Sequence, residues 1–147
     1  MQNDNNVNVL DEINKGATMG MDAIMFVYDK VGDETFKKVL DGEYKKYKNI
    51  SQRVSDEYEK YSIKEPHSTN VMNKAMTWYG IQMKTMTDQS NEKLSELLVQ
   101  GTNMGIIEGV RLRNQNQHTD LNQNVRQILE DFVAMQEDSV ETLKKYL

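Results

Sequence analysis

The chain matches itself at an offset of 85 residues, and this internal repeat constrains its fold more than any other feature. The segment GATMGM at residues 16–21 aligns with GTNMGI at residues 101–106. Extended without a gap, the match pairs apolar positions along two long stretches: Val9 with Leu94, Ile13 with Leu98, Phe36 with Leu121, Tyr47 with Phe132 and Tyr61 with Tyr146. The repeat predicts two equivalent helical hairpins, residues 4–61 and 89–147, joined by residues 62–88.

Apolar residues recur at steps of three and four, which is the spacing of a helix with one buried face. This pattern predicts helices over residues 4–30, 34–61, 70–87, 91–113 and 119–146. The second of these carries a heptad seam, typical of a left-handed bundle, made of Phe36, Leu40, Glu43, Tyr47, Ile50, Val54, Glu57 and Tyr61.

Short polar segments predict where the helices begin and end. Gly32 is suited to a helix C-terminus, and Asp33 to the N-cap of the next helix. A single helix over residues 70–113 would be about 66 Å long, against about 42 Å for residues 34–61. Such a helix would leave apolar surface in water, so we expect a break or sharp kink near Asp88.

These elements predict an all-α four-helix bundle with one long helical crossover, in a single domain of residues 1–147. The absence of cysteine excludes disulfides, thiolate metal sites and thiol nucleophiles. A net charge of -5 argues against nucleic-acid binding, and the lack of a long apolar run against membrane insertion. The first residues do not read as a secretory signal, so a cytoplasmic location is expected.

The segment MKTMTDQSNEKLSELLVQGTNMGIIE, residues 83–108, resembles a group of uncharacterised bacterial ferritin-like proteins, most closely over residues 100–108. The resemblance implies the ferritin-like fold, and the group has no established activity. Ferritin-like enzymes hold two metals with glutamates and two Glu-x-x-His motifs. Neither motif exists here, because Lys64 precedes His67 and Gln115 precedes His118 by three residues. A histidine-ligated metal pair is therefore not expected.

Three glutamates fall on helix faces that should look inward: Glu43, Glu57 and Glu108. Converging carboxylates could hold a divalent metal, and Glu108 is the best candidate because the stripe around it is the clearest. In the alternative, which we favour, small rotations turn Tyr44 and Tyr58 inward and leave the glutamates at the rim.

Glycines one turn apart form two stripes in the repeat, Gly16 with Gly20 and Gly101 with Gly105. We expect these stripes to face each other near the pseudo-two-fold axis and to allow close helix packing; the alternative is a cavity for a small apolar ligand. A second stripe, Met72, Met76, Met83 and Met86, predicts core or interface rather than soft-metal ligands.

No phosphate-binding loop, Ser-His-Asp set or other catalytic motif is present, so neither catalytic residues nor a cofactor are predicted. The leading hypothesis is a non-enzymatic ferritin-like bundle that acts through protein contacts, as a homo-oligomer or with a protein partner. The alternative is metal binding by core carboxylates, with a storage, sensing or weak oxidase role.

Overall fold

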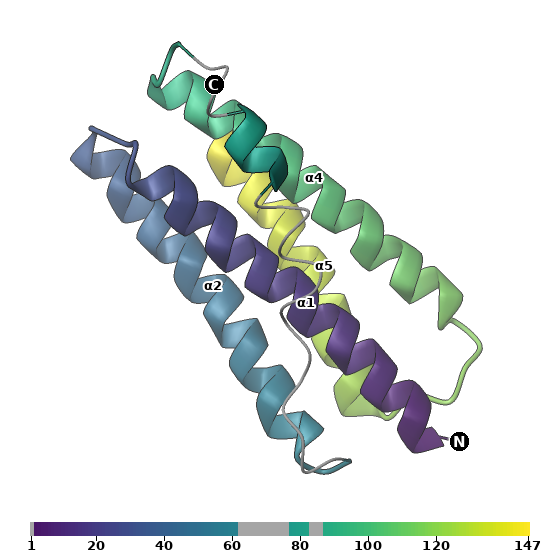
Figure 1. Cartoon of the computed structure of the whole chain (residues 1–147). Coiled ribbons are helices and arrows are strands. Elements are labelled where there is room, and N and C mark those ends of the chain that lie inside the picture. The colour runs from purple at the N-terminus through teal and green to yellow at the C-terminus, as the bar shows by residue number, and fades with distance from the viewer. Residues whose placement is uncertain (1, 62–76, 83–86) are drawn as a thin grey trace.

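A computed structural model describes residues 2–61, 77–82 and 87–147. Four long helices lie side by side in one bundle: α1 (Gln2–Tyr28), α2 (Glu34–Tyr58), α4 (Asn91–Gln115) and α5 (Gln123–Lys144). α1 is antiparallel to α2 and α4 is antiparallel to α5, whereas α2 and α4 run in the same direction (Figure 1). A short helical segment at residues 77–82 lies near α4. The most extensive contacts join α1 with α2 and α4 with α5, so the two expected hairpins are present.

Side-chain caps begin α2 and α4 at the expected positions. The Asp33 carboxylate accepts hydrogen bonds from the amides of Thr35, at 2.7 Å, and Phe36, at 3.1 Å. Ser90 caps α4 by accepting from the Lys93 amide at 3.3 Å, and residues 87–89 are not helical, which confirms the break near Asp88. The expectation for Gly32 is wrong, because α1 ends at Tyr28 and no described glycine has a positive φ.

The heptad seam of α2 is buried as the sequence predicts from Phe36 to Glu57, but α2 ends at Tyr58, which is buried, and Tyr61 is only half-buried. The buried residues of α2 are Phe36, Leu40, Glu43, Tyr47, Ile50, Val54, Glu57 and Tyr58. They pack with the inner faces of the other helices into one core, which includes Val9, Ile13 and Val27 of α1 and Leu129 and Val133 of α5. The core runs the length of the bundle, so its stability derives from apolar burial along all four helices.

The two hairpins are related by a pseudo-two-fold axis, which appears in reciprocal contacts between α2 and α5. Lys46 pairs with Asp138 at 3.1 Å, and Arg53 pairs with Asp131 at 2.9 Å. Asp131 and Asp138 lie 85 residues after Lys46 and Arg53, so each pair is the other's equivalent. Such exchange is what a two-fold relation requires. Tyr47 and Phe132, also equivalent, meet edge-to-face with ring centroids 6.5 Å apart.

The outward surfaces of the helices differ in character. On α2 and α5 the exposed side chains are mostly charged or polar, such as Lys45, Lys48, Gln127 and Glu137. On α1 and α4, exposed apolar side chains include Met25 and Ile107. Within the described residues, none of the helices is long and apolar enough to cross a membrane.

Candidate functional site

The most deeply buried carboxylate of the bundle centre belongs to Glu43, which is 3% exposed. Lys46, three residues further along α2, brings its Nζ to 3.0 Å from Glu43 Oε1, and Ser139 of α5 donates a short hydrogen bond to Oε2. Burial alone would lower the pKa of Lys46, but its hydrogen bonds to Glu43 and Asp138 outweigh burial and raise the pKa above its ordinary value. The ammonium therefore neutralises the buried charge.

Glu57 repeats this arrangement two heptads later on α2. It is 7% exposed, and Lys60 Nζ lies 3.0 Å from its Oε1. The interpretation that Glu43 and Glu57 lie at the rim is therefore wrong, although Tyr58 does turn inward as that interpretation expected. In the sequence, a lysine follows each seam glutamate by three residues, which places its ammonium beside the carboxylate on the same helix. This spacing indicates a buried carboxylate whose charge is balanced by its own helix.

Glu108 points outward, contrary to the expectation for it. Its side chain is 71% exposed and pairs with Arg111 at 2.6 Å. A strict heptad stripe drifts by about 20° per heptad around an unsupercoiled helix. Two heptads after Leu94 the drift has reached about 40°, and the buried position passes from Glu108 to Gly109.

The three glutamates do not converge. Glu43 and Glu57 are fourteen residues apart on one helix, about 21 Å along its axis, and Glu108 lies on the outer side of α4. Across the described segments, no three His, Cys, Asp or Glu side chains are grouped as metal ligands. His118 is exposed in the turn after α4, while His67 and the Met72, Met76, Met83 and Met86 stripe lie outside the described residues.

The glycines make room for side chains rather than for a facing backbone, so the expected glycine-to-glycine packing is wrong. A Cβ at Gly16 would lie 2.8 Å from Phe132 Cζ, and one at Gly20 would overlap the Tyr47 ring. At Gly101 it would strike the Tyr79 hydroxyl, and at Gly105 the Gln136 amide. Each glycine is therefore a notch filled by one large side chain from another element.

Two of these side chains form a buried phenol pair between helices. Tyr47 and Tyr79 are each 4% exposed. Burial raises the pKa of Tyr47 far above its ordinary value and outweighs a hydrogen bond with Thr102, which lowers the pKa. Burial, and then the proximity of Tyr47, raise the pKa of Tyr79 as well. Burial therefore favours the neutral phenol at both positions.

Other polar groups of the core satisfy one another. Gln136, 2% exposed, donates to the Gly105 carbonyl at 3.4 Å. Ser51 donates to Asn14 Oδ1 at 2.8 Å, between α2 and α1. These pairs join neighbouring helices, so they help to specify the register between them. The sequence patterns did not single out Gln136 or Ser139, because the sequence does not show which residue of another helix a polar side chain on a heptad face will bond.

Asp22 of α1 differs from these groups. Its Oδ2 is buried and has no hydrogen-bond partner. Burial raises the pKa of this carboxyl above its ordinary value. The sequence carries no signal for it, because Asp22 follows Met21 on a stretch whose inward positions are Ala23 and Ile24.

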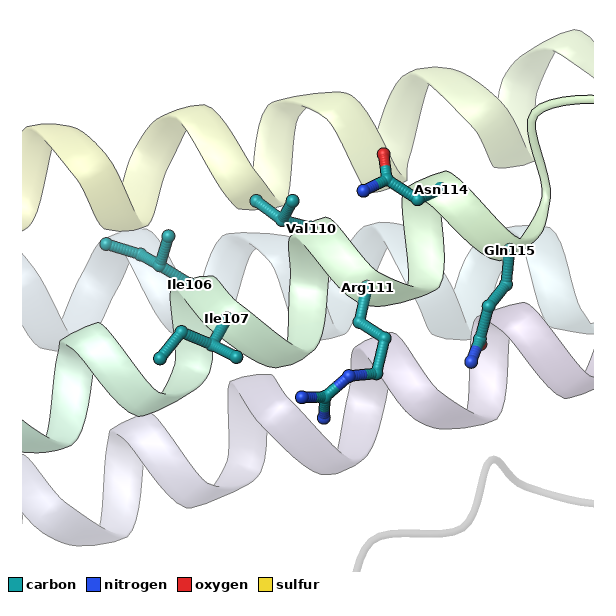
Figure 2. Close-up of a pocket in the computed structure, with 6 residues that line it drawn as sticks. All are labelled: Ile106, Ile107, Val110, Arg111, Asn114 and Gln115. Atoms are coloured by element: carbon teal, nitrogen blue, oxygen red, sulfur yellow. The ribbon is translucent and has the colours of Figure 1, made fainter.

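The outer side of α4 carries an open apolar groove (Figure 2). Ile106, Val110 and Asn114 point toward α5, whereas Ile107, Arg111 and Gln115 point toward α1. Ile107 is 54% exposed, and Met104, one turn earlier, is 46% exposed. This surface has apolar area without a cluster of reactive groups, which is typical of a contact surface rather than an active site.

Neither a protein-family model nor a curated protein matches the sequence. Among solved structures, a mutant of Mycobacterium smegmatis Dps1 superposes with a TM-score of 0.80, over 99% of this chain and 97% of that chain. The two sequences are 13% identical, so the similarity shows the fold alone. It confirms the ferritin-like, all-α four-helix bundle that the repeat and the resemblance predict.

Proposed function

We propose that this chain is a non-enzymatic ferritin-like bundle that acts through protein contacts, as a homo-oligomer. The observation that carries the proposal is the uneven distribution of exposed apolar side chains. Within the described part of the chain, the large exposed ones are Met25, Ile81, Met104, Ile107 and the C-terminal Leu147. Four of these five lie on α1, α4 and the crossover segment, and α2 and α5 contribute none.

Apolar side chains left in water on selected helices favour association. Burying apolar surface contributes roughly 25 cal/mol per Å². The core chemistry supports the same reading, because Glu43 and Glu57 are neutralised within the chain by Lys46 and Lys60. Inward carboxylates with their own ammonium partners have less need of a metal to offset the cost of burial.

Sedimentation of the purified chain over a range of concentrations tests this proposal, together with a pull-down from its source. We expect masses that are multiples of the 17.1 kDa chain. A strict monomer contradicts the homo-oligomer, and a monomer that also captures no partner contradicts action through protein contacts altogether.

Metal analysis of protein purified without a chelator tests the carboxylate alternative. About one transition metal per chain, lost in Glu43→Gln or Glu57→Gln, would replace our proposal with metal binding. Glu108→Gln serves as the matched control, because Glu108 is outward and already paired with Arg111.

A further inference from the structure

The apolar surface of α4 is confined to its C-terminal half. In the N-terminal half the exposed residues are polar: Glu92, Lys93, Gln100 and Asn103. From residue 104 onward the exposed residues include the apolar Met104 and Ile107, which with Glu108, Arg111, Asn114 and Gln115 we name the α4 outer face. The apolar residues are thus gathered into one patch rather than scattered along the helix.

Opposite charges lie within this patch. Glu108 and Arg111 are 71% and 57% exposed and stand one turn apart. Met104, Glu108, Arg111 and Gln115 form a seam with steps of four, three and four. A second copy of the seam that runs in the opposite direction has the same spacing, so Met104 of one copy lies opposite Gln115 of the other, and Glu108 lies opposite Arg111. The α4 outer face is therefore complementary in charge to a reversed copy of itself.

We propose that a second copy of this chain docks on the α4 outer face, with the two α4 helices antiparallel about a two-fold axis between residues 109 and 110. Glu108 of each copy then faces Arg111 of the other, and Ile107 is covered by the opposing helix. A two-fold interface must be self-complementary in this way. A partner surface with charges of a single sign would repel either Glu108 or Arg111, so the pair of opposite charges favours a second copy of this chain. The inference rests on the proposed homo-oligomer and names its contact surface.

Sedimentation equilibrium of two variants beside the wild type tests the surface. Ile107→Glu places a charge at the centre of the patch and is expected to weaken self-association roughly tenfold or more. Gln100→Glu, on the polar half of the same helix, is the matched control and is expected to associate like the wild type. Since Ile107 is 54% exposed, the substitution leaves the core unchanged, and circular dichroism checks that the helices are retained.

The charge pair tests the orientation. Glu108→Arg alone brings like charges together across the axis and is expected to weaken association, whereas the swap of Glu108→Arg with Arg111→Glu restores it. An oligomeric wild type whose mass is unchanged in Ile107→Glu overturns this surface but leaves the proposed function standing. Equal association of the single reversal and the swap overturns the antiparallel arrangement. A monomeric wild type overturns both the surface and the homo-oligomer.

Discussion

Replacement of Gly20 by alanine tests whether the glycine notches hold the packing of the bundle. A Cβ at Gly20 would lie 2.6 Å from Tyr47 Cζ, and other atoms of the ring would be nearer still. The ring cannot swing into solvent, because Tyr47 is 4% exposed and lies edge-on to Phe132. The helices or the tyrosine must therefore shift.

The magnitude follows from two opposing terms. Overpacking a filled core costs roughly 1–3 kcal/mol and sometimes more, while alanine gains about 1 kcal/mol over glycine within a helix. The severe overlap at Gly20 places the cost near its upper limit, so we expect the free energy of unfolding to fall by about 1–2 kcal/mol. Gly42, exposed within α2 and with nothing within 4 Å of an added Cβ, has only the gain. Gly42→Ala should therefore stabilise by about 1 kcal/mol.

Urea unfolding followed by far-ultraviolet circular dichroism measures both substitutions. Combining Gly20→Ala with Tyr47→Leu, which removes the ring, should cost less than the sum of the two single changes. A Gly20→Ala protein as stable as the wild type, beside a stabilised Gly42→Ala protein, would show that the Tyr47 ring does not fill a tight notch at Gly20.

Three further changes probe the core. Asp22→Asn should raise the Tm at neutral pH, because burial raises the pKa of Asp22 and so disfavours its charged form in the folded protein. The gain should be lost as the pH falls below 3.8, where the carboxyl is protonated in both the folded and the unfolded protein; thermal scans in which the gain persists there would contradict this. Lys46→Met should lower the free energy of unfolding, measured in urea, by roughly 1–3 kcal/mol; this is less than the roughly 3–5 kcal/mol for breaking a fully buried ion pair, because the Lys46 side chain is 38% exposed. Adding Glu43→Gln to this variant should recover part of the loss, since it removes the charge left without its partner. Gly101→Ala should displace Tyr79 and so change the fluorescence of the single tryptophan, Trp78, because the centroids of the two rings lie 4.8 Å apart. An unchanged emission spectrum would count against a notch at Gly101 that Tyr79 fills.

The hairpins, the Asp33 N-cap and most of the α2 seam could be predicted because each depends on local spacing. Phe36, Tyr47 and Val54 repeat in one chain segment, and Asp33 caps residues next to it. Glu108 could not be placed in the same way, because a small phase error accumulates along a helix. Whether a helix supercoils enough to keep a heptad stripe inward is decided by its neighbours.

The candidate site was less predictable, because its residues meet across helices. Gly20 receives Tyr47 and Gly101 receives Tyr79, and nothing in a glycine stripe indicates which side chain will fill it. The neutralisation of Glu43 was within reach, since Lys46 follows it by three residues on the same helix. The contact with Ser139, 96 residues away, was not.

The mass of the wild-type chain at sedimentation equilibrium, with and without a metal chelator, distinguishes action through protein contacts from metal binding. If the bundle acts through contacts between protein surfaces, the mass exceeds that of one 17.1 kDa chain and is the same in both conditions. A monomer at every concentration without any captured partner, or an assembly that dissociates when metal is removed, would contradict the account.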